Sequence, residues 1–399
     1  MEVAREVTYR CSPRGAVLYT CSWRPVPPAA APSPRGALLL LSGYNSYTGP
    51  NHDWLASLFL PAGIAVYGLD HHGFGRSTDA HTCALPAPSL LSSCARSARR
   101  TLCCFGRLGY LPSFPALVSD AVHTALAIAA QHPGQPLFLL GESMGGTVAL
   151  EASLALQAAG QPCHLLLLAP MCSLGRAVAV PPLLQAAGYA LSLLAPLLPN
   201  PVLKDTAALH CKSPERLRDA AADPLRWQRP MRLATAFALK GAAAAAQGRL
   251  AAFAPASMLV LHGSSDAMCP LEGSLALLAA SPCQDKALVE YQGALHSLWA
   301  EPVATRRLLA LDLLAWVAAR AGLEAGSLLQ GEGLGGAAAE LARAPSVRES
   351  ARGPGRFLHC ARPEGAGVFQ DASLWTALPY RAEEAAAAAQ GARGAASVQ

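Results

Sequence analysis

Residues 137–147 read LFLLGESMGGT, an apolar run that ends at a glycine and is followed by glutamate, serine, methionine and two more glycines. The run at 137–140 predicts a short buried strand, and the alanine- and leucine-rich segment 147–159 predicts a helix. A serine between two such elements lies on a sharp turn, where the flanking residues avoid collisions only if they lack side chains. Gly141 and Gly145 occupy the flanking positions. The stretch therefore predicts Ser143 as an exposed nucleophile, with an ordinary glycine-rich turn as the alternative.

Short apolar runs recur along the chain, with helical patterns between them, at 37–41, 64–69, 164–169, 258–261 and 287–291. Because these runs are continuous rather than alternating, they are typical of a parallel sheet that is covered by helices on both faces. Segments 7–11 and 17–23 predict an antiparallel hairpin before the first run. The expected fold is α/β, with a mostly parallel sheet flanked by helices.

Three segments depart from this pattern and suggest the domain organisation. We expect residues 1–170 to form the first part of the core, with 80–107 as an inserted flexible loop rich in Ser, Ala, Cys and Arg. Residues 171–250, mostly helical in character, would form a cap, and 251–330 the remainder of the core. Residues 331–399, rich in Ala, Gly and Arg, show no strand periodicity and are predicted to be a disordered tail.

Composition excludes several classes of protein. The 399 residues are 52% hydrophobic and 14% charged, which supports a sizeable core and excludes disorder throughout. The net charge of +5 is modest, and the only dense basic cluster, between Arg96 and Arg107, lacks interleaved aromatic residues. No nucleic-acid partner is therefore expected.

The cysteines and the N-terminal sequence predict where in the cell the protein is located. The 12 cysteines show no spacing typical of metal ligands and are best explained as reduced, small apolar side chains. The N-terminal sequence MEVAREVTYR lacks the apolar core of a secretory signal. The most apolar stretch, 183–198, is too interrupted to span a membrane. We predict a cytoplasmic protein, with peripheral membrane contact at most.

A serine hydroxyl becomes a good nucleophile only when a histidine takes its proton and an acid orients that histidine. The sequence MLVLHGSSDAMCP ends one predicted strand and places Asp266 in the loop beyond it, and VEYQGALHSLW does the same for His296. Both residues follow the carboxyl ends of strands, where open α/β sheets build their sites. We predict the catalytic set Ser143, Asp266 and His296.

Two other residues compete for these roles. Asp285 is the alternative acid, but it precedes its strand and would lie at the opposite edge of the sheet. His262 is the alternative base, although it lies within the end of a predicted strand.

The negative oxygen that forms when a serine attacks a carbonyl needs hydrogen-bond donors. One predicted donor is the backbone N–H of Met144, which directly follows the nucleophile at the start of its helix. The second is the N–H of Tyr44, in the loop SGYNSYTGP after the strand at 37–41. Together they would form the oxyanion hole.

Taken together, these motifs resemble the monoacylglycerol lipase-like branch of the α/β-hydrolases, in particular the plant and algal group that includes caffeoylshikimate esterase-like proteins. The resemblance covers about residues 7–314 and rests on the stretches LYTCSWRP, GLDHHGFGRSTD, GYLPSFPALVSD, LLGESMGGTVALE, LLLLAPMC, VLHGSSDAMCP and EYQGALHSLW. It implies the α/β-hydrolase fold with an inserted helical cap, and it assigns the same triad and the same two oxyanion donors.

The chain departs from the family pattern at two places. It has Ser42-Gly43 where the family usually has His-Gly, so the hydrogen bonds that steady the oxyanion loop must differ. Residues 79–107 are inserted where the family has a short link, and they are either a surface loop of this lineage or an artefact of gene modelling.

The predicted function is a serine ester hydrolase that works through an acyl-enzyme, with a monoacylglycerol or lysophospholipid as substrate. Esters of hydroxycinnamoyl type are the alternative substrates, and a non-catalytic receptor for a small ligand is the alternative of another class. No metal or organic cofactor is expected, because serine, histidine and backbone donors suffice.

The predicted cap carries a candidate surface for the acyl chain. In VPPLLQAAGYALSLLAPLLP the apolar residues recur at helical intervals, with a kink expected at Pro196. If this face lines the mouth of the site, the substrate would contact Leu183, Leu184, Leu191 and Leu194. The alternative is that the face packs on the sheet domain.

Overall fold

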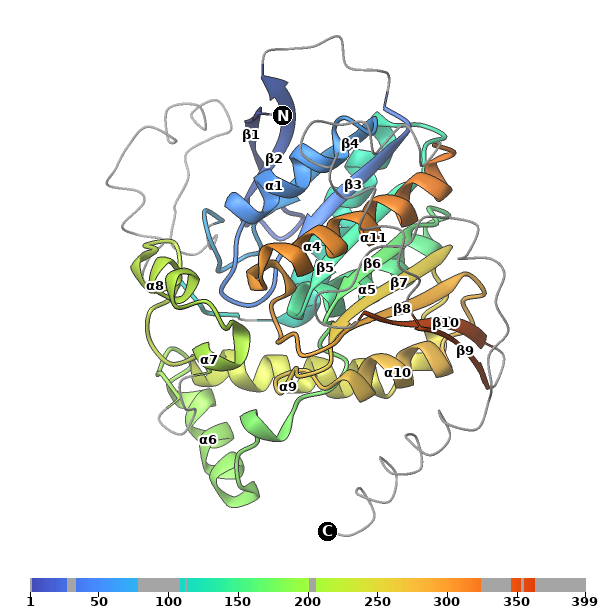
Figure 1. Ribbon diagram of the computed structural model, residues 1–399. Helices are drawn as coiled ribbons and strands as arrows, with labels where there is room; N and C mark the ends of the chain where they lie inside the picture. The colour runs from blue at the N-terminus through green and yellow to red at the C-terminus, as the bar shows by residue number, and fades with distance from the viewer. Residues whose placement is uncertain are drawn as a thin grey trace.

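The computed structural model describes residues 2–26, 34–77, 108–111, 113–200, 206–323, 346–352 and 355–362 (Figure 1). The predicted inserted loop at 80–107 lies outside the described residues.

The strands form one 10-stranded sheet in the order β1-β2-β4-β3-β5-β6-β7-β8-β10-β9. Neighbours from β4 to β8 in this order are parallel, whereas β1, β2 and β4 are joined by antiparallel pairing. This is the mostly parallel sheet that the sequence predicts. The strands are β1 (Glu2–Cys11), β2 (Val17–Val26), β3 (Gly36–Leu41), β4 (Ile64–Leu69), β5 (Leu137–Glu142), β6 (His164–Leu168), β7 (Ser257–Gly263), β8 (Lys286–Tyr291), β9 (Ser346–Arg352) and β10 (Gly355–Arg362).

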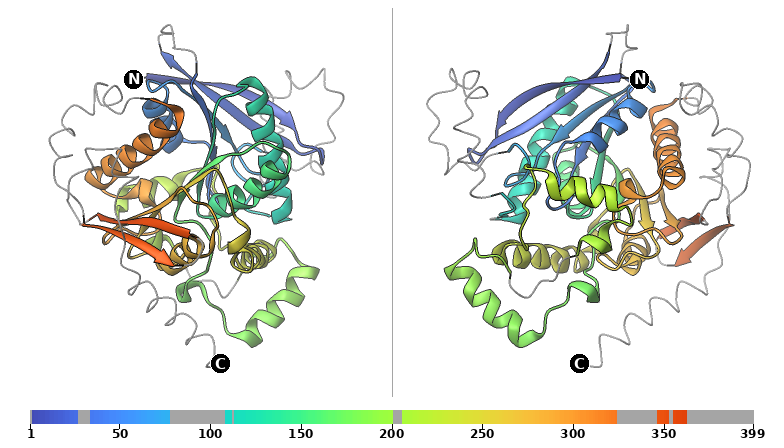
Figure 2. Two further views of the ribbon diagram at one scale, coloured as in Figure 1. Left: turned by 90° about the vertical axis from the view of Figure 1, so that its right-hand side faces the viewer. Right: turned by 60° about the vertical axis from the view of Figure 1, so that its left-hand side comes forward.

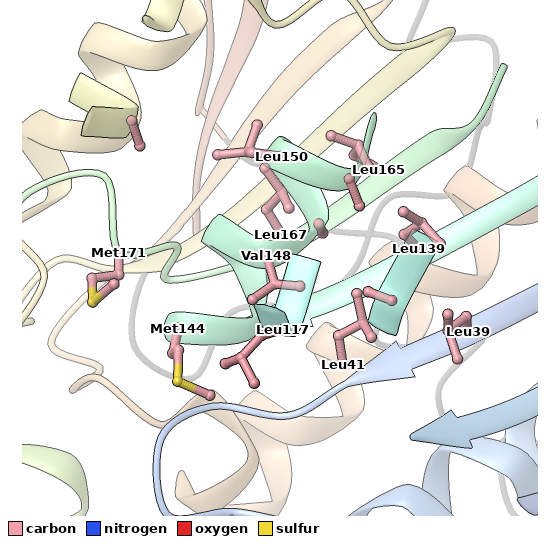
Figure 3. Close-up of a cluster of buried hydrophobic side chains, with 14 of the residues drawn as sticks. Leu39, Leu41, Leu117, Leu139, Met144, Val148, Leu150, Leu165, Leu167 and Met171 are labelled. Carbon is pink, nitrogen blue, oxygen red and sulfur yellow. The ribbon is translucent and has the colours of Figure 1, made fainter. Parts of the chain in front are cut away.

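Strand β3 is apolar and buried at every position because both faces of the sheet are covered. In β3, Leu39 and Leu41 belong to one core cluster, whereas Leu38 and Leu40 belong to the other. Figure 3 shows the first cluster, in which leucines of β3, β5 and β6 meet helix side chains such as Leu117. Alternate side chains of a strand therefore pack into two separate cores, so the strand sequence is a continuous apolar run.

Helices cover both faces of the sheet (Figure 1). Helices α1 and α11 pack on the cluster around Leu38, and α4, α5, α9 and α10 pack on the cluster around Leu39. The helices and short 3₁₀ segments are α1 (Pro50–Phe59), α4 (Phe114–Gln131), α5 (Met144–Ala158), η2 (Arg176–Val178), α6 (Pro182–Leu194), α7 (Ala207–His210), α8 (Pro214–Ala222), α9 (Leu233–Gln247), η3 (Leu250–Ala252), α10 (Leu271–Ala280), η4 (Leu298–Ala300) and α11 (Val303–Ala321).

Helices α6 to α9 fill the interval between β6 and β7, where we predicted a cap. Helix α9 also serves the core, because Leu239, Ala242 and Ala246 are buried in the same cluster as α5. Small alanines at such a contact let two helices approach closely. Helix α6 lies farther out and extends away from the sheet in both views of Figure 2. Its recorded ring contact is between Tyr189 and Phe237 of α9, with centroids 5.4 Å apart.

The predicted kink at Pro196 is wrong, because α6 ends before it. The helix stops at Leu194, and Ala195 leaves helical geometry with φ −135° and ψ 68°. The ring of a proline disfavours helical geometry in the residue before it, so the helix terminates where a kink was expected.

Within the tail that we predicted to be disordered, residues 346–352 and 355–362 form strands. Strands β9 and β10 pair with each other, and β10 continues the sheet in parallel beside β8. The segments SVRESAR and GRFLHCAR mix charged and apolar residues, so they carry no local strand signal. Their pairing depends on the edge that β8 offers, which lies far away in the sequence.

Seven cysteines whose side chains the structure describes are free thiols, and all of these seven except Cys11 are buried. Burial raises the pKa of the Cys21, Cys163 and Cys172 thiols to about 12, which keeps them protonated and unreactive at neutral pH. Among the described helices, none combines the length and apolarity needed to cross a bilayer.

Candidate active site

Ser143 lies on a strained turn between β5 and α5. Its backbone has φ 52° and ψ −116°, a conformation that non-glycine residues rarely adopt. A Cβ on Gly141 would come within 2.3 Å of the Gly145 carbonyl oxygen, and a Cβ on Gly145 would come within 2.2 Å of the Leu41 oxygen. The two glycines are therefore required by backbone crowding, as the sequence predicts.

The side chains of Ser143, His296 and Asp266 meet at the carboxyl edge of the sheet. His296 Nε2 lies 2.9 Å from Ser143 Oγ, and His296 Nδ1 lies 2.6 Å from Asp266 Oδ2. A carboxylate can only accept, so Nδ1–H donates to Asp266 and Nε2 is left to accept the Ser143 proton. The three residues form a continuous hydrogen-bond chain with the polarity that nucleophilic catalysis needs.

Asp266 is fixed in place by its own loop. Its Oδ1 accepts hydrogen bonds from the backbone N–H groups of Met268, at 2.8 Å, and Cys269, at 3.0 Å. Burial alone would raise the pKa of Asp266, but hydrogen bonds from His262 and His296 hold it well below its usual range. The carboxylate is therefore ionised at neutral pH, as a partner of the base should be.

The two alternative residues lie elsewhere. His262 is wholly buried; its Nε2–H donates to the Cys269 carbonyl at 2.7 Å and lies 3.3 Å from Asp266 Oδ2. His262 thus lies behind Asp266 and contacts its carboxylate. Asp285 pairs with Arg320, with 2.9 Å between Asp285 Oδ2 and Arg320 Nε, beyond the opposite edge of the sheet.

The two residues predicted to be oxyanion donors, Met144 and Tyr44, lie on chain segments next to Ser143. Met144 is the first residue of α5, so its N–H points out of the helix end that carries partial positive charge. A Cβ on Gly43 would lie 3.4 Å from Ser143 Cβ, which places the loop that carries Tyr44 directly against the serine. Within the described ranges, neither N–H donates to another backbone carbonyl.

The oxyanion loop is tied to the segment between α8 and α9. Asn45 Nδ2 donates to the Trp227 carbonyl at 3.0 Å, and its Oδ1 accepts from the Trp227 N–H at 2.7 Å. The Tyr47 hydroxyl donates to Asp223 at 2.6 Å. A shift of this part of the cap would therefore move the oxyanion loop.

Ser42 and His52 contact each other at the base of this loop, where the resemblance leads one to expect His-Gly at positions 42–43. Gly49 N–H donates to His52 Nδ1 at 3.2 Å, which leaves the proton on Nε2, 3.3 Å from Ser42 Oγ. Burial lowers the pKa of His52 to about 4, so the ring is neutral. A histidine ten residues later thus contacts the serine that stands in the family's histidine position.

The leucines proposed to contact the acyl chain remain on the outside of the molecule. Leu183 and Leu194 are 82% and 85% exposed, and within α6 only Ser192 is buried. Residues this exposed do not line an enclosed site in this structure. The structure therefore brings the triad and the oxyanion loop together, but leaves the apolar face of α6 turned to solvent.

Sequence reasoning missed several groups around the triad. The His210 ring of α7 lies edge-on to the His296 ring, with centroids 5.2 Å apart, and Glu142 accepts from the Ser297 hydroxyl at 3.1 Å. The position of Glu142 beside the serine was a signal, whereas nothing in the sequence near His210 indicated this contact.

No group of three or more His, Cys, Asp or Glu side chains within the described ranges could hold a metal ion.

Several known proteins are similar to this chain. Residues 32–303 match the family described as serine aminopeptidase, S33. Monoacylglycerol lipase of Mycolicibacterium smegmatis is 30% identical over 285 residues, which cover 71% of this chain and 88% of that protein. Monoglyceride lipase of Rattus norvegicus is 25% identical over 316 residues, 77% of this chain and 88% of the relative.

Among solved structures, a soluble variant of monoglyceride lipase from Saccharomyces cerevisiae, in complex with a substrate analog, has a TM-score of 0.62 at 18% identity. The match covers 79% of this chain and 96% of the yeast chain. At this level of identity the likeness concerns the fold.

Proposed function

We propose that this chain, which belongs to the serine aminopeptidase S33 family, cleaves lipid monoesters with Ser143 as nucleophile. It is a monoacylglycerol lipase-like serine hydrolase of the α/β-hydrolase fold. The hydrogen-bond chain from Asp266 through His296 to Ser143 carries the proposal. The substrate would be a monoacylglycerol or a lysophospholipid.

In the first half of the reaction, the Ser143 oxygen attacks the ester carbonyl carbon while its proton passes to His296 Nε2. The carbonyl oxygen becomes negative and accepts hydrogen bonds from the N–H groups of Met144 and Tyr44. The imidazolium is stabilised by the Asp266 carboxylate. When the carbon–oxygen bond breaks, His296 gives its proton to the departing alcohol, and an acyl-enzyme remains on Ser143.

In the second half, water replaces the alcohol. His296 takes a proton from the water as its oxygen attacks the acyl carbon, and then returns a proton to Ser143 as the fatty acid leaves. No redox step or co-reactant other than water is needed, so the chemistry balances with the groups described above.

Two observations favour a lipid monoester as the proposed substrate. Two relatives of this chain are named monoacylglycerol lipase and monoglyceride lipase. The outer surface of the chain carries the apolar face of α6, including Leu183, Leu193 and Leu194. A large exposed apolar patch is typical of a surface that meets lipid or another protein.

The substrate class can be tested with purified protein and a series of monoacylglycerols of increasing chain length. We expect kcat/KM to rise with chain length into the medium or long range, because each buried methylene adds about 0.8 kcal/mol of binding. A hydroxycinnamoyl ester serves as the comparison substrate. A flat chain-length profile with faster turnover of the aromatic ester would reject the lipid assignment.

The exposed face of α6 is proposed to dock on the surface of a lipid membrane, which would give a cytoplasmic enzyme peripheral access to its substrate. The double substitution Leu183→Asp and Leu194→Asp should lower binding to phospholipid vesicles by at least about tenfold, because partial insertion of a leucine stabilises binding by about 1 kcal/mol or more. Sedimentation with vesicles measures this.

A matched control is Val303→Asp, which places the same charge on an exposed apolar residue at the start of α11. Turnover of a short, water-soluble ester should be unchanged in the α6 variant and in Val303→Asp, because all three substituted side chains are exposed. Equal vesicle binding by the parent and the α6 variant would contradict docking through this face.

A further inference from the structure

Glu142 links the nucleophile to the loop that carries the base. It is the last residue of β5 and directly precedes Ser143. Its Oε1 accepts a hydrogen bond from Ser297 Oγ at 3.1 Å, and the Trp299 side chain also bonds to the carboxyl group. Both partners follow His296 within three residues, so one carboxylate holds the loop at two points.

The same loop is secured by its backbone from the other side. Ser297 N–H donates to the His210 carbonyl of α7 at 3.0 Å, and Leu295 N–H donates to Glu301 at 2.7 Å. These bonds fix the loop to the cap and to itself. Of the interactions described, the Glu142 carboxyl is the one that ties the side chains beside His296 to the strand that ends at Ser143.

The carboxyl group is also placed to act through its charge. Burial raises the pKa of Glu142 above its usual range, and the hydrogen bonds from Ser297 and Trp299 offset this rise only in part; a positive charge on His296 favours the ionised carboxylate. An imidazolium forms on His296 as Ser143 attacks, and a nearby carboxylate stabilises that positive charge. Such a contribution is greater in the transition state than in the resting enzyme.

Other titratable groups lie close to Glu142 and His296. Asp266 and the His210 ring face His296 directly, and His262 contacts Asp266 from behind. Arg226 acts on Glu142 through its charge. None of these groups is removed by a substitution at Glu142, so their effects remain constant in a comparison of Glu142 variants.

We propose that Glu142 is a positioning residue for the base, which sets the place of His296 relative to Ser143 through Ser297 and Trp299 and favours the imidazolium through its charge. The proposal rests on the proposed function of the triad. It adds a role for a residue that the hydrogen-bond chain of Ser143, His296 and Asp266 does not include.

Two substitutions separate the charge from the hydrogen bond. Glu142→Gln keeps a side chain of the same shape that can pair with Ser297 but removes the charge, whereas Ser297→Ala keeps the charge and removes one bond. We expect Glu142→Gln to lower kcat about tenfold with KM within about twofold, since a charge of this kind is worth about one pKa unit. Ser297→Ala should lower kcat only by about threefold.

The pH profile distinguishes this role from a purely structural one. Removing a negative charge beside His296 makes its protonation less favourable, so the acid limb of kcat/KM should move to lower pH by about one unit in Glu142→Gln. The limb should stay in place in Ser297→Ala. Thermal unfolding monitors the fold of each variant.

If Glu142→Gln does not fold, Glu142→Asp provides the second test, because it keeps the charge but withdraws it by one methylene from Ser297. It should lower kcat about fivefold or more and leave the acid limb near its original pH. Wild-type kcat and an unmoved limb in Glu142→Gln, or wild-type kcat in Glu142→Asp if only that variant folds, would overturn the proposal. Ester turnover by Ser143→Ala at the wild-type rate would instead reject the proposed function itself.

Discussion

Replacing Ser143 with alanine is expected to lower kcat for ester hydrolysis by about 10⁴- to 10⁶-fold, the range typical of removing a catalytic serine. The loss follows because Ser143 Oγ is the atom that His296 Nε2 can deprotonate, at 2.9 Å. Labelling by a fluorophosphonate, which needs the same activated oxygen, should disappear. These two measurements also separate an enzyme from a non-catalytic receptor built on the same fold.

The variant should remain folded. Alanine keeps the Cβ of serine, so the strained backbone at φ 52° is neither relieved nor made worse. The midpoint of thermal unfolding should therefore change little. Ser265→Ala is a matched control, because Ser265 is an exposed serine in the neighbouring loop and should retain activity and labelling. Labelling of folded Ser143→Ala at the wild-type level would contradict the assignment of the nucleophile.

The parts of the structure that the sequence predicted are those governed by local rules. The continuous apolar runs matched central strands because both sheet faces are buried, as Leu38 and Leu39 illustrate. The glycines around Ser143 were informative because the backbone approaches within the reach of a Cβ. Residues that follow strand ends, such as Asp266 and His296, could be placed together because parallel strands share one carboxyl edge.

What the sequence did not predict depends on contacts between distant segments. The ring contact of His210 with His296 joins the cap to the base across 86 positions in the numbering, from 210 to 296. Strand β10 pairs with an edge that only the folded sheet provides, and β9 in turn pairs with β10. The amphipathic pattern of α6 predicted an apolar face, but whether that face meets the core or solvent is decided by where the helix is attached.

Asp266→Asn is expected to lower kcat by about 10⁴-fold, although the substitution changes only one atom of the side chain. The reason lies in how the structure would orient the new amide. Two backbone donors, the N–H groups of Met268 and Cys269, contact Oδ1 at 2.8 and 3.0 Å. They require an oxygen at that position, so the NH₂ group of the introduced amide would take the place of Oδ2.

That orientation turns an amide donor toward His296 Nδ1, which in the native structure donates to Asp266 Oδ2 at 2.6 Å. The ring would move its proton to Nε2 in order to accept at Nδ1, and Nε2 could then no longer take the proton of Ser143. His262 Nε2–H, 3.3 Å from the same position, would also face a donor instead of a carboxylate.

The activity of Asp266→Asn should recover partly at high pH, where hydroxide can take the Ser143 proton directly. A pH–rate profile of the folded variant measures this. A loss of less than about tenfold at neutral pH would show that the hydrogen-bond chain does not set the tautomer of His296.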